Sequence, residues 1–157
     1  MGFSPLGLIV GVLVLAPNLL LLRFPPRPAL PTVRVPWPLA WAERAGQALC
    51  LVVPAITEPG PIAWGWSALV AAALAAYLTL WGRYLATGRH PWALFGPVLR
   101  VPVPMAILPV VAFLATAAWL ANPWIALAAV VLAVGHIPSS LLMAGAVAGM
   151  RGDSRRG

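Results

Sequence analysis

Long apolar runs, separated by short polar or proline-rich segments, dominate the pattern of this chain. Five of them approach the ~20 residues that an α-helix needs to cross the hydrocarbon core of a bilayer. The runs lie near residues 4–23, 38–57, 62–84, 102–121 and 124–147. The second is the most polar, because Glu43, Arg44 and Gln47 fall in its first turns. The pattern predicts an all-α integral membrane bundle of about five transmembrane helices with no soluble domain.

The composition indicates the solvent of the chain. Hydrophobic residues make up 62% of its 157 residues and charged residues only 8%, whereas an ordinary soluble domain is roughly 45–50% apolar and about 25% charged. A single domain of this length cannot hide so much apolar surface from water, which excludes an ordinary soluble protein. The last two runs are separated only by Asn122 and Pro123, which favours a tight hairpin, with one long re-entrant element as the alternative. Residues 150–157 are expected to form a disordered tail.

All ten basic residues are arginines, and their positions predict an orientation. They form three groups, which are Arg23, Arg27, Arg34 and Arg44 near the first loop, Arg83, Arg89 and Arg100 around the third, and Arg151, Arg155 and Arg156 in the tail. With five spans, all three groups lie on the same side of the membrane. Basic loops mark the cytoplasmic side, so we expect an N-out, C-in protein.

The net charge of +7 does not indicate a nucleic-acid partner. Nucleic-acid binding needs a basic soluble face, and these arginines lie between apolar runs. Arginines in such places can contact anionic lipid headgroups at the cytoplasmic face. The expected partners are therefore the lipid bilayer, and either a second copy of the chain or another membrane protein.

Polar residues inside the predicted spans gather at one depth, in the half of the bundle nearest the arginines. They are Asn18, Glu43, Arg44, Gln47, Tyr77, Arg83, Tyr84, His136, Ser139 and Ser140. A polar side chain that faces lipid is costly, so these should point inward and pair with one another. We expect Glu43 to pair with Arg83 or Arg44, and His136 to bond to Asn18 or a tyrosine. The cluster is either a cytoplasm-facing pocket or a set of hydrogen bonds that holds the helices together.

His136 lies in the middle of the last apolar run. Pro138 removes the N–H that would bond to the carbonyl of Val134, and Ser139 and Ser140 lie on the same helix face as His136. Two interpretations stay open. In the first, the helix is kinked and its own polar groups satisfy the opened backbone. In the second, His136 handles protons or binds a ligand, as intramembrane ionisable residues often do.

Small residues four apart predict close helix packing at two places. Gly7 and Gly11 lie in the first run, and Gly145 and Gly149 at the end of the fifth. Such spacing lets two backbones approach closely, and we expect internal packing, with a dimer face as the alternative. The sequence has no P-loop, HExxH, CxxC or GxSxG motif and a single cysteine, Cys50. It therefore predicts no catalytic residue, metal site or cofactor.

Several segments resemble a group of small polytopic bacterial integral membrane proteins of unknown function. They are APNLLLLRFPP, ERAGQALCLVVPAI, WGRYLATGR, VPVPMAILPVVAFLATAAWL and GHIPSSL. Together they touch all five predicted spans. The resemblance implies a helical bundle in a bacterial inner membrane, and it implies no activity and no catalytic residue.

The residues favour a non-enzymatic role as an accessory or assembly subunit that acts through helix and lipid contacts. The alternative is a small transporter or ligand-binding membrane protein whose cytoplasm-facing site contains Glu43, Arg83 and His136. A more distant alternative is an intramembrane enzyme that acts on a lipid or isoprenoid.

Overall fold

The computed structural model describes the backbone of residues 2–153 and the side chains of residues 2–150. The described residues form helices and loops, without a β-strand. In chain order the helices are α1 (Pro5–Leu15), η1 (Ala16–Leu19), α2 (Leu20–Arg23), α3 (Trp37–Ile56), η2 (Trp64–Trp66), α4 (Ser67–Ala86), α5 (Pro91–Phe95), α6 (Pro104–Trp119) and α7 (Pro123–Asp153). The predicted all-α class is confirmed.

Three helical stretches are long and apolar enough to cross a membrane, which indicates a membrane protein. They are Pro5–Arg23, Trp64–Ala86 and Pro123–Met150. The apolar helix α6 is shorter than a standard span, at 16 residues, and α3 has 20 residues but carries the polar side chains noted above. The prediction of five spans and of an N-out, C-in orientation stays a prediction.

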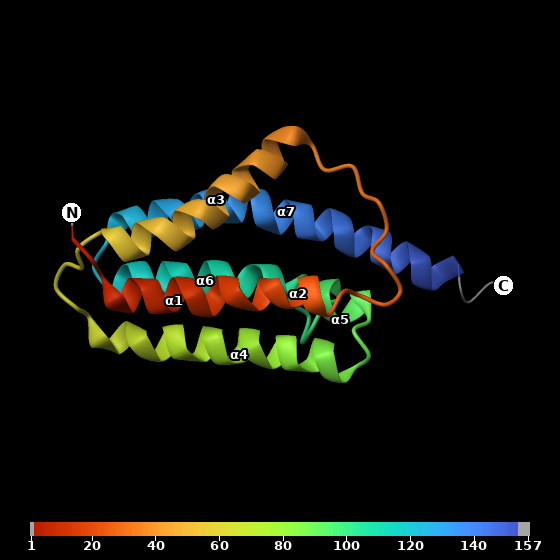
Figure 1. Ribbon diagram of the computed structural model, residues 1–157, viewed down its shortest axis with the longest axis horizontal. Helices are drawn as coiled ribbons and strands as arrows, with labels where there is room; N and C mark the ends of the chain where they lie inside the picture. Colours follow the sequence, from red (N-terminus) through yellow and green to blue (C-terminus); the bar gives the residue numbers. More distant parts are fainter. Residues whose placement is uncertain (1, 154–157) are drawn as a thin grey trace.

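The helices α1, α4, α6 and α7 run roughly parallel to the long axis of an elongated bundle, and α3 crosses it obliquely with its first turns leaning away from the other helices (Figure 1). At the end that holds the N-terminus, the N–H of Gly60 donates to the carbonyl of Leu120 at 2.8 Å. At the opposite end, the hydroxyl of Tyr84 donates to the carbonyl of Phe24 at 2.7 Å. Successive long helices therefore alternate in direction.

A short turn joins α6 to α7 and makes a helical hairpin. Proline at the first position of α7 fits because that position needs no N–H partner. The preceding Asn122 is buried, and its side-chain oxygen accepts the N–H of Trp124 at 3.1 Å. Its amide nitrogen donates to the hydroxyl of Thr57 at 2.7 Å. One side chain thus starts α7 and ties the hairpin to the end of α3.

The helix α7 ends later than the sequence predicted. The expectation of a disordered tail from residue 150 is wrong for residues 150–153, which continue α7. No proline follows Pro138, and each residue added to an existing helix gains a backbone hydrogen bond. Residues 154–157 lie outside the described residues.

Candidate functional site

The crossing of α3 and α7 is built on two glycines from different helices. Gly46 of α3 lies against the backbone of Leu132, and Gly135 of α7 lies against the backbone of Glu43. A Cβ atom at either position would overlap the backbone of the other helix. The absence of side chains at both glycines therefore lets the two helices meet in direct backbone contact.

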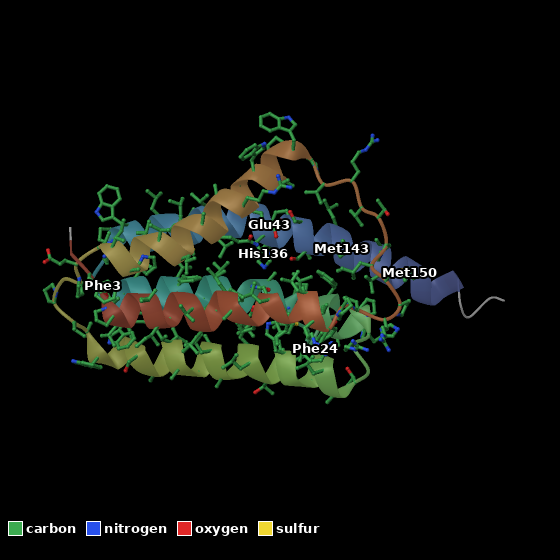
Figure 2. The ribbon with its side chains drawn as sticks, in the orientation of Figure 1. Phe3, Phe24, Glu43, His136, Met143 and Met150 are labelled. Atoms are coloured by element: carbon green, nitrogen blue, oxygen red, sulfur yellow. The ribbon has the colours of Figure 1, made fainter. Side chains whose placement is uncertain are left out.

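This crossing brings Glu43 beside His136 (Figure 2). Glu43 Oε1 lies 2.7 Å from His136 Nδ1, and about a quarter of each side chain is exposed, 25% and 23% respectively. An ionised carboxylate only accepts hydrogen bonds, so with Glu43 ionised the proton of this contact is carried by Nδ1. The far edge of the imidazole, which carries Nε2, points away from Glu43.

The predicted partners of these two residues are wrong. Among the described side chains, Glu43 pairs with His136 and not with an arginine, and His136 does not bond to Asn18 or to a tyrosine. The reason is geometric, because the glycine crossing places Glu43 directly beside the residue that follows Gly135. Arg44, the next residue of α3, is exposed.

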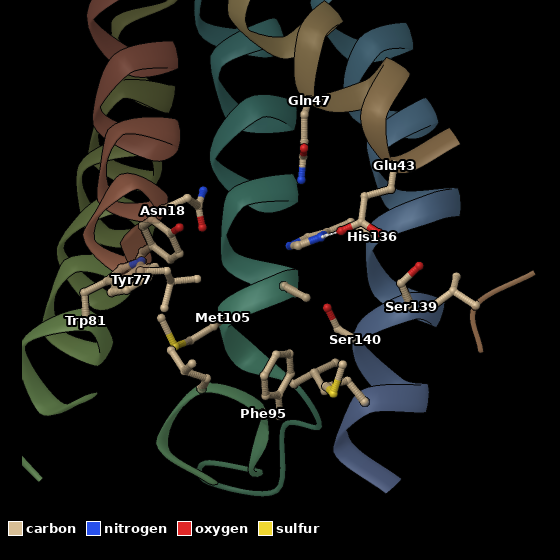
Figure 3. Close-up of a pocket in the computed structure, with 16 residues that line it drawn as sticks. Asn18, Glu43, Gln47, Tyr77, Trp81, Phe95, Met105, His136, Ser139 and Ser140 are labelled. Atoms are coloured by element: carbon tan, nitrogen blue, oxygen red, sulfur yellow. Dashed lines mark hydrogen bonds and ion pairs between the residues drawn. The ribbon is translucent and has the colours of Figure 1, made fainter. Parts of the chain in front are cut away.

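A pocket of about 370 Å³ opens beside this pair (Figure 3). The polar side chains that line it are Asn18, Glu43, Gln47, Tyr77, His136, Ser139 and Ser140. The rest of the wall consists of Leu21, Val35, Trp81, Leu94, Phe95, Val103, Met105, Ala106 and Met143. Residues from seven helices and two loops thus converge on one space, in the half of the bundle nearest the arginine-rich loops.

No family model, curated protein or solved structure matches this chain. Its function is therefore inferred from the geometry of the pocket. Within the described residues, no group of three or more His, Cys, Asp or Glu side chains could hold a metal ion.

The polar residues of the pocket are held by different local structures. Asn18 lies in η1, where Pro17 interrupts the α-helical pattern between α1 and α2. Tyr77 of α4 is 2% exposed and packs edge-on to Trp81, with ring centroids 6.4 Å apart. Ser139 follows Pro138 in α7, and its buried hydroxyl has no hydrogen-bond partner among the described residues. The pocket therefore contains polar groups that the fold itself does not use.

Three residues of the predicted cluster lie outside the pocket. Arg44 is exposed on α3. Arg83 donates from Nη2 to the carbonyl of Ala93 at 3.1 Å, and Tyr84 bonds to Phe24 as described above. Arg83 thus holds α5, and Tyr84 holds the segment that follows α2, at the basic end of the bundle, which is a structural role.

The two predicted glycine pairs have different surroundings. Gly7 lies against the backbone of Pro54, and a Cβ at Gly11 would lie 3.3 Å from the carbonyl oxygen of Cys50, so both face α3. Gly145 and Gly149 have no described atom within 4 Å of a Cβ position. The first pair is in position to pack α1 on α3, whereas the second lies on open surface of α7.

Sequence reasoning missed the apolar wall of the pocket and the glycines of the crossing. Phe95 and Leu94 reach the pocket because α5 packs at the end of the bundle opposite the N-terminus, where Leu94 and Ala93 are buried. The segment before α6 gave no long apolar run from which this helix could be predicted. Gly46 and Gly135 are single glycines on separate helices, so a search for paired glycines within one helix does not find them.

Proposed function

We propose that this chain is an integral membrane protein that binds a small organic ligand in the pocket beside Glu43 and His136, as a binding protein or a small transporter. The observation that carries the proposal is the convergence of polar side chains from η1, α3, α4 and α7 on one pocket of about 370 Å³. Ligand sites in proteins are typically apolar clefts of about 300–1,000 Å³ with a few polar groups.

The hydrogen bonding supports a pocket over a purely structural cluster. If the polar groups served only to hold helices together, they would bond to one another across the helices. Instead, the side chains of Gln47, Ser139 and Ser140 have no hydrogen bond in the part of the chain that the structure describes. Other polar groups of the pocket do pair, since Glu43 bonds to His136 and the hydroxyl of Tyr77 bonds to Asn18.

The arginine positions support five spans with the N-terminus outside and the pocket facing the cytoplasm of a bacterium. Arg27, Arg89 and Arg100 lie in the loops at one end of the bundle, whereas the segment around Glu58 at the other end has no basic residue. Basic loops stay on the cytoplasmic side, where they would also contact anionic lipid headgroups.

Cysteine labelling tests this topology. In a Cys50→Ala background, Glu58→Cys is expected to react with a membrane-impermeant maleimide in intact bacterial cells. Arg100→Cys should react only in inverted membrane vesicles, because five spans put these two exposed positions on opposite sides. Labelling of both variants from the same side would contradict the five-span topology, and the reverse pattern would contradict the orientation.

Native mass spectrometry of the protein in a mild detergent tests the binding function. We expect the parent to retain a small molecule and Ser140→Phe to lose it, because the added ring would fill the pocket that Ser140 lines. Thr79→Phe is the control, since Thr79 is exposed on α4 and the bound mass should persist. Retention of the same molecule by Ser140→Phe, or a parent without any bound small molecule, would contradict the proposal.

The accessory-subunit role is the second candidate, and one observation favours it. The C-terminal part of α7 extends beyond the other helices (Figure 1), and it carries Gly145 and Gly149 on open surface. A second copy or a partner chain retained in the same mass spectrum, without a small molecule, would support this candidate over the binding protein.

A further inference from the structure

We propose that the pocket selects an organic cation, namely a protonated amine attached to an apolar group. The inference rests on the proposed binding function and names the class of ligand. Its first support is the charge of the lining. Glu43 contributes a carboxylate, whereas no arginine is among the described residues that line the pocket, although the chain has ten.

The absence of arginine from the lining disfavours an anionic ligand. Arg83 lies on α4, the helix that also carries Tyr77 and Trp81. Its guanidinium nevertheless bonds to Ala93 and lines a separate pocket with Thr87. An anion would therefore meet the carboxylate of Glu43 with no guanidinium to offset it. A charge inside a membrane protein needs an opposite charge or strong hydrogen bonds, and a cation finds both here.

The hydrogen-bonding atoms of the pocket match an ammonium group. In the tautomer that carries its only ring proton on Nδ1, His136 donates to Glu43 and offers Nε2 as an acceptor, while Glu43 keeps a second oxygen. Gln47 and Asn18 add amide oxygens from the facing helices. An ammonium has three donors and no acceptor, so it can satisfy several of these atoms at once.

The opposite wall of the pocket suits the apolar part of such a ligand. Trp81, Phe95 and Met105 lie across from the Glu43–His136 pair (Figure 3). Aromatic faces attract cations through the negative potential of the ring, and methionine adapts to apolar groups of varied shape. The ammonium would lie by Glu43 and the apolar group against these side chains.

The charge preference can be tested with three probes of similar shape. They are 4-phenylbutylamine, 4-phenylbutanol and 4-phenylbutyrate. Calorimetric titration of the full chain in dodecyl maltoside should show the amine binding roughly tenfold or more tightly than the alcohol, and no binding of the carboxylate. Equal or tighter binding of the alcohol or the carboxylate, or no binding of any probe, would overturn the cation assignment.

Matched variants locate the effect. Glu43→Gln should weaken amine binding by roughly tenfold or more, whereas Glu58→Gln makes the same change at an exposed residue at the far end of the bundle and should leave binding unchanged. Phe95→Ala shortens the wall against which the apolar group would lie, and it should weaken the amine and the alcohol by similar factors. Unchanged amine binding in both Glu43→Gln and Phe95→Ala would overturn the assignment.

The same experiments separate this inference from the proposed function. If the alcohol or the carboxylate binds best and Ser140→Phe abolishes that binding, the pocket is a ligand site of another class. If no probe binds and Ser140→Phe retains the same bound mass as the parent, both the cation class and the binding function fail.

Discussion

Gly135→Ala is expected to lower the melting temperature of the protein, although alanine is the better helix former. The new methyl group would overlap the backbone at Glu43. This overlap can be relieved only if α3 moves away from α7. Overpacking of this kind costs about 1–3 kcal/mol. In a protein of this size each kcal/mol shifts the melting temperature by about 2–4 °C, so we expect a fall of about 2–12 °C. Gly46→Ala should act in the same direction.

Gly82→Ala is the matched control for this prediction. Gly82 is an exposed residue of α4 with no described atom within 4 Å of a Cβ position. There the higher helix propensity of alanine, about 1 kcal/mol, should leave the melting temperature unchanged or raise it. Cys50 is buried and is the only cysteine of the chain, so a thiol-reactive dye reports unfolding directly. If Gly135→Ala and Gly82→Ala behave alike, the close crossing of α3 and α7 is wrong.

The helix positions could be predicted from the sequence because long apolar runs and prolines mark where helices lie and begin. The predicted runs differ from the helices by a few residues at most of their ends, and prolines begin α1, α6 and α7. Each helix advances a fixed length per residue, so the sequence could place polar residues at one level along the bundle, and seven of the ten line one pocket. Such signals depend on one segment at a time.

The contacts within the site depend on how two helices are rotated and crossed, which no single segment specifies. Glu43 pairs with His136 because Gly46 and Gly135 bring two particular helix faces together. Nothing in the spacing of Arg83 shows that its side chain turns toward Ala93 instead. Likewise, the five-residue helix α5 is too short to produce a periodic pattern, yet it supplies part of the pocket wall.

A double-mutant cycle on Glu43 and His136 is expected to show that the two residues stabilise each other but that the fold does not need them. His136→Leu leaves the carboxylate of Glu43 without its hydrogen-bond partner inside the bundle. Glu43→Leu leaves only an imidazole unpaired, which can be neutral. Breaking a fully buried pair costs about 3–5 kcal/mol. Because these side chains are about a quarter exposed, we expect a loss of about 1–3 kcal/mol, larger for His136→Leu.

The Glu43→Leu/His136→Leu double variant should melt close to the parent, because two leucines replace the pair with apolar groups suited to the bundle. With a double variant close to the parent, the coupling energy from the four melting curves equals the sum of the two single losses, about 2–6 kcal/mol. If the two single losses simply add, the residues do not interact as the 2.7 Å contact requires. The double variant should also fail to bind 4-phenylbutylamine. A double variant that keeps the melting temperature of the parent but no longer binds the amine would show that the pair serves ligand binding. Loss of a purely structural pair would instead lower the melting temperature.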